Sequence, residues 1–237
     1  MKKVAFAQSW VLVTGASSGL GSEFARQLAH RGANLVLTAR SLERMNQLAQ
    51  DLERVNGVRT HTLAADLSEA SGVRTLLDGV DALGVPIEHV VNNAGFGAVG
   101  SFAEGDAASQ TRMVRVNVEA VTAIARHFLP RMVAAGGGGL IQVASTAAHQ
   151  PTPYMATYGA TKAYVLSLSL ALAEEVRPQG VRVLALCPGP TPTNFQQTAG
   201  IPRSRWMPML EVQVGAVVEA ALEGYDAGRR VVTPGTL

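Results

Sequence analysis

The chain has 237 residues, of which 47% are hydrophobic and 16% charged, a balance that excludes an intrinsically disordered protein. Its 20 basic and 18 acidic residues leave a net charge of +2, which is too even for a nucleic-acid-binding face or a membrane-binding patch. The single cysteine, Cys187, excludes an intrachain disulfide and a thiolate metal cluster, so we expect no bound metal.

A lone cysteine is typical of a reducing compartment, and no apolar run approaches the ~18 residues of a membrane helix. The apolar stretch at residues 4–7 is too short for the core of a signal peptide. We therefore expect a cytoplasmic protein that forms a single domain over residues 1–237, with neither a membrane nor a nucleic acid as its partner.

Short apolar segments alternate with helical ones along the chain. Strands are expected over 10–14, 34–39, 59–65, 89–92, 140–144, 181–187 and 230–233. Helices are expected over 22–31, 42–56, 69–83, 107–135, 157–177 and 211–225. Continuous apolar strands separated by helices are typical of parallel sheets buried on both faces. The pattern predicts an α/β fold of the Rossmann type, a doubly wound parallel sheet of about seven strands with helices on both faces.

A glycine-rich loop joins the first strand to the first helix. Gly15, Gly19 and Gly21 have the spacing G-x-x-x-G-x-G, and Ser17 between them adds a hydroxyl donor. Glycines let the backbone approach a pyrophosphate, which then lies at the free N–H groups of a helix N-terminus. The alternative is a flexible turn without a ligand. The position directly after a first strand favours nucleotide binding.

The end of the second strand indicates which dinucleotide binds. An acidic residue there would contact the ribose 2′-hydroxyl, whereas an arginine would accommodate a 2′-phosphate. This strand ends at Arg40, and the first acidic residue after it is Glu43. Although Arg40 would also suit a solvated helix entry, its planar cation favours NADP(H) over NAD(H).

Tyr158 and Lys162 are four residues apart on a predicted helix and so share one face. A phenol is a poor proton donor or base near neutrality, since its pKa is about 10. A nearby ammonium stabilises the phenolate and is expected to lower that pKa. Tyr154 and Tyr164 lack a lysine at the same spacing, so Tyr158 is the candidate catalytic tyrosine.

Together these segments resemble the short-chain dehydrogenase/reductase family, of the single-domain kind, over almost the whole chain. The further positions that carry the resemblance are Asp66, the segment Asn92-Asn93-Ala94-Gly95, Asn117, Ser145, Pro188-Gly189 and Thr193. The cofactor-binding residues that it implies are Gly15, Ser17, Ser18, Gly19, Leu20, Gly21, Arg40, Asp66, Leu67, Asn93, Ala94, Gly95, Tyr158, Lys162, Pro188, Gly189, Thr191 and Thr193.

The resemblance implies hydride transfer between NADPH and a carbonyl carbon, with Tyr158 donating or accepting the proton. Ser145 would hold the carbonyl oxygen, Lys162 would bind the ribose, and Asn117 would hold a water that relays protons. Simpler alternatives remain for three residues. Ser145 could cap a strand end, Asn117 could satisfy backbone at a helix kink, and Asp66 could cap a turn.

Three segments are expected to border a small-molecule carbonyl or alcohol substrate: 96–101, 149–155 and the loop 194–210. Phe96, Phe195 and Trp206 are the candidate substrate contacts and favour a hydrophobic or medium-sized ketone. Trp206 could instead anchor the loop to the core. Arg203 and Arg205 could contact an anionic tail or remain solvated.

Other functions stay open. A 3-oxoacyl-thioester reductase would use the same residues, since a fold does not fix a substrate. An NADP(H)-sensing regulator and a lyase or epimerase are the alternatives of other classes. The helix 157–177 is apolar nearly all round, and the resemblance implies that it and the helix of Asn117 form a homodimer or homotetramer.

Overall fold

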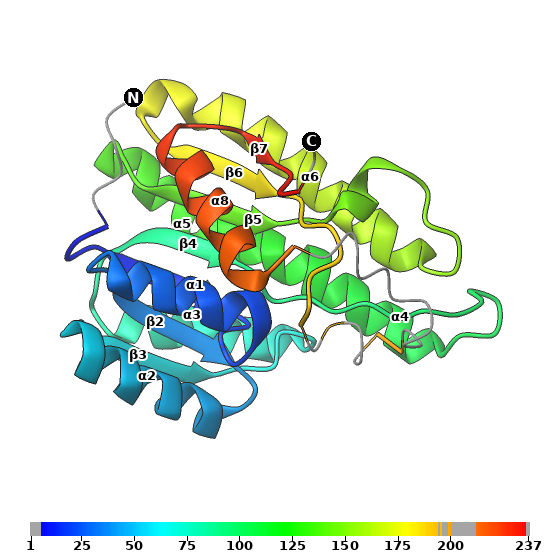
Figure 1. Cartoon of the computed structure of the whole chain (residues 1–237), viewed down its shortest axis with the longest axis horizontal. Coiled ribbons are helices and arrows are strands. Elements are labelled where there is room, and N and C mark those ends of the chain that lie inside the picture. The colour runs from blue at the N-terminus through cyan, green and yellow to red at the C-terminus, as the bar shows by residue number, and fades with distance from the viewer. Residues whose placement is uncertain (1–5, 194, 196–198, 201–211, 236–237) are drawn as a thin grey trace.

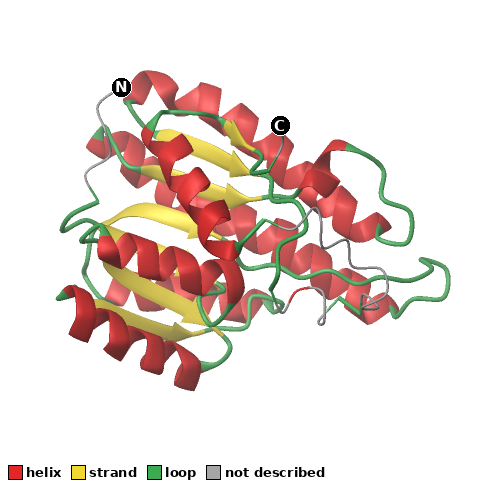
Figure 2. Ribbon diagram, in the orientation of Figure 1, coloured by secondary structure: helices red, strands yellow, loops and turns green. Residues whose placement is uncertain are grey.

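A computed structural model describes residues 6–193, 195, 199–200 and 212–235, and its centre is one parallel sheet (Figures 1 and 2). The seven strands are β1 (Trp10–Thr14), β2 (Asn34–Ala39), β3 (Thr60–Ala64), β4 (Ile87–Asn92), β5 (Gly139–Val143), β6 (Arg182–Leu186) and β7 (Val231–Val232). The main helices are α1 (Gly19–His30), α2 (Leu42–Asn56), α3 (Ala70–Ala82), α4 (Ala107–Val114), α5 (Val121–Ala135), α6 (Ala156–Val176) and α8 (Val214–Asp226).

The strand order in the sheet is β3-β2-β1-β4-β5-β6-β7, and every neighbouring pair is parallel. The chain runs outward from β1 to β3 and then returns to place β4 on the other side of β1. In doubly wound sheets, ligands bind at such a reversal, which here lies at the carboxyl ends of β1 and β4. The doubly wound Rossmann-type fold predicted from the sequence is confirmed.

Apolar side chains cover both faces of the sheet. On one face, α1, α2 and α8 contribute Phe24, Met45 and Val217 to one core cluster; on the other, α3 and α5 contribute Leu76 and Phe128 to a second. Figure 1 shows the first set of helices in front of the strands. Because both faces are buried, the strands are apolar in almost every position, as the sequence pattern indicated.

The helix expected over 107–135 is continuous but changes its hydrogen-bond pattern in the middle. Arg115–Ala120 is a π-helical segment between α4 and α5. Such a segment accommodates one extra residue per turn and frequently occurs at functional sites. The last expected helix begins at Val214 rather than at residue 211, which lies outside the described residues.

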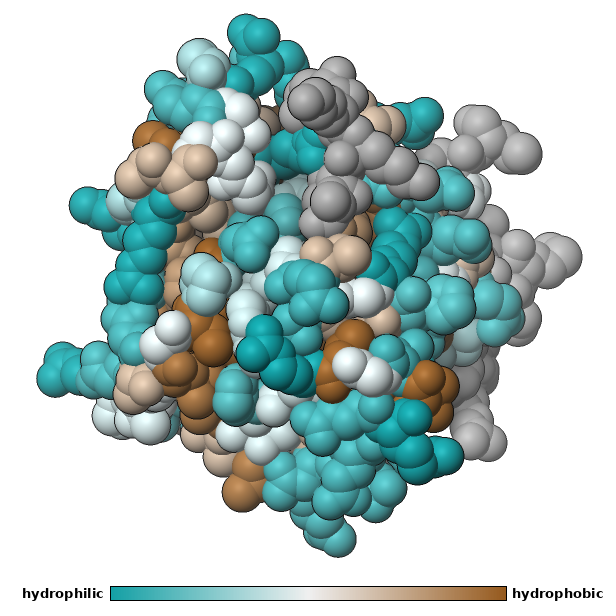
Figure 3. Space-filling view, turned by 90° about the vertical axis from the view of Figure 1, so that its left-hand side faces the viewer, coloured by the Kyte–Doolittle hydropathy of each residue, from teal (hydrophilic) through white to brown (hydrophobic). Residues whose placement is uncertain are grey.

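No helix among the described residues is both long and apolar enough to span a bilayer. The face seen in Figure 3 is the one at the amino ends of the strands, and it is mostly hydrophilic with scattered apolar residues. The candidate functional residues lie at the opposite edge, where the strands end.

Candidate active site

The predicted site residues gather at the carboxyl edge of the sheet. Each group of them follows a different strand, and parallel strands bring their carboxyl ends to one edge. The groups are the glycine loop after β1, Arg40 after β2, Asp66 after β3, Asn93 after β4, Ser145 after β5 and Pro188 after β6. Tyr158 and Lys162 reach the same edge from α6.

The glycine loop is fitted closely against the end of β4. Gly15 has φ of +66°, and a Cβ there would lie 2.9 Å from Asn93 Nδ2. A Cβ on Gly21 would overlap the Gly15 carbonyl oxygen. Asn93 Nδ2 donates to the Thr14 carbonyl at 2.9 Å. These positions therefore require glycine, because a side chain would push the loop away from β4.

Thr14 is a structural residue of this edge that the sequence did not single out. Its Oγ1 accepts the backbone N–H groups of Asn93 at 3.0 Å and Ala94 at 2.9 Å. The hydroxyl thereby fixes the turn after β4 against the turn after β1. As the first letter of the Thr-Gly-Ala-Ser-Ser-Gly run, Thr14 carried a signal only through its place beside the glycines.

The N-terminus of α1 suits an anion. No side chain caps it, and its N-cap Ser18 is extended, so the orphan N–H groups of the first turn are not satisfied from within the helix. The partly buried side chain of Leu20 packs against the core. Thr193 faces Gly19 from the opposite side, 3.4 Å from where a Cβ would lie. The loop, the helix terminus and the missing side chains together fit a dinucleotide pyrophosphate.

Arg40 is exposed at the end of β2, where it is accessible to a ligand. Asp66 accepts Ser68 N at 2.9 Å and Ser68 Oγ at 2.7 Å, so its carboxylate caps a turn, as the simpler alternative proposed. These bonds hold the pKa of Asp66 below its ordinary value, and the charge of Arg40 adds to the effect. Leu67 is buried in the core.

Tyr158 and Lys162 lie beside each other and are both buried. Lys162 Nζ donates to the Val143 carbonyl at 2.7 Å and lies 5.8 Å from the centre of the Tyr158 ring. Ser145 lies close enough to Tyr158 to act on the pKa of its phenol, and it also caps a short 3-10 turn by accepting Ala147 N at 3.2 Å. The structure thus brings the predicted serine, tyrosine and lysine together.

The expected lowering of the Tyr158 pKa is not seen in the protein without a ligand. Burial raises the pKa of Tyr158, and the nearby Ser145 side chain opposes the rise. Burial also lowers the pKa of Lys162 to about 8. Desolvation dominates in this buried pair, because it disfavours the charged form of both the phenol and the amine.

Asn117 lies in the π-helical segment and is fully buried. Its Nδ2 donates to the Phe96 carbonyl and to Thr161 Oγ1, both at 3.0 Å, and its Oδ1 accepts Phe96 N at 3.2 Å. Thr161 Oγ1 in turn donates to the Tyr158 carbonyl at 2.8 Å. The Asn117 side chain therefore joins the loop after β4 to the helix of Tyr158, close to the simpler role of satisfying backbone.

Backbone groups complete the lysine side of the site. A Cβ on Gly95 would lie 3.0 Å from Asn117 Oδ1 and 3.3 Å from Lys162 Nζ, so a side chain at this position would press on both groups. The Pro188 carbonyl accepts Thr146 N at 2.9 Å and ties the segment after β6 to the segment after β5. Gly189 and Thr191 are joined by a 3.0 Å bond from Thr191 Oγ1.

The residues predicted to contact the substrate do not all lie at the site. The Phe195 ring lies 5.2 Å from the Tyr158 ring, whereas Phe96 packs against the core. Trp206, Arg203 and Arg205 lie outside the described residues. Gly97 lies in the segment 96–101 that was expected to border the substrate, and a Cβ there would lie 2.8 Å from Phe195 Cζ and 3.0 Å from Tyr158 Cδ2.

Two other groups near this edge have limited chemistry. Cys187 is buried, and burial raises the pKa of its thiol to about 11, so it stays protonated near neutrality. His149 is exposed on the loop before α6. Within the described part of the chain, no three histidine, cysteine or acidic residues lie close enough to hold a metal ion.

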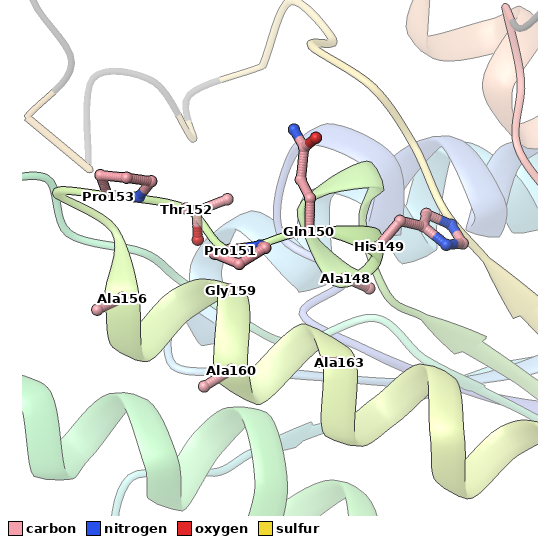
Figure 4. A pocket seen from close by; sticks show the side chains of 10 residues that line it. All are labelled: Ala148, His149, Gln150, Pro151, Thr152, Pro153, Ala156, Gly159, Ala160 and Ala163. Carbon is pink, nitrogen blue, oxygen red and sulfur yellow. The ribbon is translucent and has the colours of Figure 1, made fainter.

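An open hollow of about 570 Å³ lies on the flank of α6 (Figure 4). It is bordered by the loop 148–153 and by Ala156, Gly159, Ala160 and Ala163. Its lining includes none of Ser145, Tyr158, Lys162 and Asn117. We place the candidate active site at the strand ends, because the titratable groups lie there.

Both the sequence and the fold are similar to those of known proteins. A family model described as short chain dehydrogenase matches residues 9–203. A short-chain dehydrogenase from Sphingobium yanoikuyae, solved in complex with NADPH, is 35% identical, with a TM-score of 0.89 over 95% of this chain and 87% of its own. A bulky-bulky ketone specific alcohol dehydrogenase from Comamonas testosteroni is 34% identical, with a TM-score of 0.84 over 95% of this chain and 86% of its own.

A very-long-chain 3-oxoacyl-CoA reductase from Phaeosphaeria nodorum is 34% identical over 181 residues. The alignment covers 74% of this chain and 52% of that protein, so this chain spans about half the length of that relative.

Proposed function

Because the chain belongs to the short-chain dehydrogenase family of oxidoreductases, we propose that it interconverts a carbonyl and a secondary alcohol with NADP(H), using Tyr158 as proton donor and acceptor. The observation that carries the proposal is that Tyr158, Ser145 and Lys162 lie close together at the edge where the glycine loop opens. A bound nicotinamide supplies or accepts the hydride.

The side chains of this chain account for the remaining steps. Tyr158 is protonated near neutrality, so it donates a proton to the carbonyl oxygen during reduction. Ser145 donates a hydrogen bond to the same oxygen and holds it against the phenol. Lys162 binds the ribose hydroxyls and places a positive charge beside Tyr158. Asn117 positions the helix of Tyr158 through Thr161.

Arg40 supports NADP(H) as the cofactor. Its guanidinium is exposed at the position that would meet the 2′-phosphate, and a planar, permanently charged group suits that ligand. Several structures similar to this chain were solved with NADPH, among them that from Sphingobium yanoikuyae and L-sorbose reductase from Gluconobacter frateurii.

We propose a hydrophobic or medium-sized ketone or hydroxy compound as substrate. A 3-oxoacyl thioester is the second candidate, and the similarity to very-long-chain 3-oxoacyl-CoA reductases favours it. A protein that only senses NADP(H) would not need Ser145, Tyr158 and Lys162 close together, so the observed arrangement favours an enzyme.

Oxidation of NADPH and of NADH, measured against ketones, aldehydes, diketones and 3-oxoacyl thioesters, tests the proposal. We expect turnover by the wild type with NADPH preferred, and a loss of at least about 100-fold in Tyr158→Phe with NADPH binding retained. Tyr154→Phe is the matched control, since Tyr154 is 66% exposed, and it should keep its activity. Unchanged turnover in Tyr158→Phe would refute the catalytic role of Tyr158.

The same assay tests the choice of cofactor. Arg40→Asp should reverse the preference from NADPH to NADH, because a carboxylate repels the 2′-phosphate of NADPH and accepts a hydrogen bond from the ribose 2′-hydroxyl of NADH. If Arg40→Asp left the preference unchanged, the argument for NADP(H) would fail.

A further inference from the structure

The space on one side of Tyr158 is filled by the protein itself. The ring of Phe195 is tilted 48° to the Tyr158 ring, with 5.2 Å between their centres. Gly97 lies next to both rings. A Cβ at this position would lie 2.8 Å from Phe195 Cζ and 3.0 Å from Tyr158 Cδ2. A single methyl group bonded to Gly97 therefore does not fit between these rings.

Backbone hydrogen bonds hold Phe195 in this position. Phe195 N donates to Thr193 Oγ1 at 3.2 Å, and the Phe195 carbonyl accepts Ala199 N at 2.8 Å. The Ala199 carbonyl accepts Val99 N at 2.9 Å, so the segment of Phe195 is tied to the segment that contains Gly97. The contact between the three residues thus belongs to one connected border of the site.

This border limits the shape of a carbonyl substrate. Its oxygen must come within about 3 Å of the Tyr158 hydroxyl to receive a proton. The two substituents of the carbonyl carbon then lie on opposite sides of it, and a substituent that extends toward Phe195 has that ring as its border.

We infer that Phe195, seated against Gly97, is a specificity-determining residue that admits only a small substituent on this side of Tyr158. The substrate class is ketones with one substituent of about methyl size, such as methyl ketones, and the corresponding secondary alcohols. The inference rests on the proposed function, since it needs a carbonyl at Tyr158.

The selectivity between matched ketones tests the inference. The kcat/KM of the best methyl ketone is compared with that of its analogue in which isopropyl replaces the methyl group. We expect the wild type to prefer the methyl ketone and Phe195→Ala to reduce this preference at least about tenfold, within the range that pocket contacts give for one or a few carbon atoms. Phe195→Leu should give an intermediate ratio and replaces Phe195→Ala if that variant melts at a much lower temperature.

Phe102→Ala is the matched control, because Phe102 is also an aromatic residue on a loop at this edge but is 67% exposed. It should retain the wild-type ratio. If the wild type turns over these ketones and both Phe195 variants show the wild-type ratio of kcat/KM values, the inference is overturned and the proposed function stays intact. Wild-type protein that turns over no carbonyl or alcohol would overturn both.

A double-mutant cycle tests the contact itself. Gly97→Ala should reduce kcat/KM at least about tenfold in the wild-type background, because its methyl group displaces the two rings. In the Phe195→Ala background the same change should cost several-fold less, since contacting residues couple. The melting temperatures of the four proteins without cofactor should show the same coupling. Additive effects in both measurements would overturn the inference.

Discussion

Lys162 has no room for bulk water around its amino group, and this sets its titration. Its Nζ is buried and donates to the Val143 carbonyl, and burial lowers its pKa to about 8. The charge beside Tyr158 is therefore lost as pH rises through about 8, while the phenol, whose pKa burial raises, keeps its proton.

Carbonyl reduction should follow the charge on Lys162. We expect kcat with NADPH to be constant below about pH 8 and to fall above it. The neutral amine does not stabilise the phenolate that forms when Tyr158 donates its proton, and it binds the ribose less tightly. Lys162→Arg carries a permanent charge and should lack this fall, whatever its absolute rate. A pH profile of Lys162→Arg that still falls near 8 would assign the titration to another group.

Individual residues differ in how far the sequence reveals them. The spacing of Tyr158 and Lys162 predicts that they share a helix face, and the structure places them together. The sequence places Thr14 beside the glycine run and Gly97 in a substrate-side segment, but their roles depend on contacts with Ala94 and Phe195, which are far away along the chain. The pKa of Tyr158 depends on burial, which spacing does not report.

Elements at the amino edge of the sheet are joined by a buried histidine. His89 of β4 shares a 2.9 Å hydrogen bond between its Nδ1 and the Tyr225 hydroxyl of α8, and it packs against Phe6 at 5.1 Å. Burial, together with the charge of Arg182, lowers the pKa of His89 from 6.5 to about 4. His89 therefore stays neutral in the folded protein at pH values between about 4 and 6.5, at which it is protonated in the unfolded chain.

This difference makes stability depend on pH. His89 contributes its full stabilisation above pH 6.5, and we expect the free energy of unfolding to fall as pH drops from 6.5 to about 4. The loss is roughly 3 kcal/mol, from about 1.4 kcal/mol per pKa unit. Asp81, whose pKa is lowered from 3.8 to about 2, acts only at lower pH.

Urea unfolding at several pH values checks this expectation. His89→Gln keeps a partner for Tyr225 but does not titrate, so its stability should be nearly flat between pH 6.5 and 4. His30→Gln, at an exposed position of α1, is the control and should keep the slope. An equal slope in His89→Gln and the wild type would show that other groups cause the acid sensitivity.

Element boundaries followed the periodicity of the sequence closely, because strands buried on both faces and amphipathic helices leave clear patterns. The exception is the long helix that contains Asn117. Its apolar spacing predicted a helix over 107–135, but the structure has a π-helical segment inside it, which contains Asn117 with its bonds to Phe96 and Thr161. Such a change of register is set by tertiary contacts and is not visible in the local pattern.

At the scale of the whole molecule, the arrangement of the strands determines where the site residues gather. The parallel strands bring six chain segments to one edge, and the alternation of strands and helices was sufficient to predict a doubly wound parallel sheet, although not the order of its strands. The substrate side was less predictable. Its shape depends on long connections such as the one that holds Phe195, which have no periodicity.

The outer face of α6 remains uncovered in a single chain, although this helix is apolar nearly all round. Five exposed residues follow one another on that face with helical spacing: Ala160, Ala163, Tyr164, Ser167 and Leu170. Ala160 and Ala163 also border the hollow in Figure 4, so a partner can approach the backbone there. We propose that a second copy of the chain packs on this face, because twofold assembly pairs a surface with itself.

Ser167→Arg tests this assembly without disturbing the monomer, since Ser167 is exposed in the centre of the face. Light scattering of the wild type should give at least twice the chain mass of 24.8 kDa, as a dimer or tetramer. The variant should give a smaller assembly, because each twofold contact would bury two positive charges that repel each other. Gln47→Arg, which adds the same charge to an exposed position of α2, should assemble like the wild type. If Ser167→Arg also assembled like the wild type, the contact would have to use another face, and the uncovered side of α6 would need a different explanation.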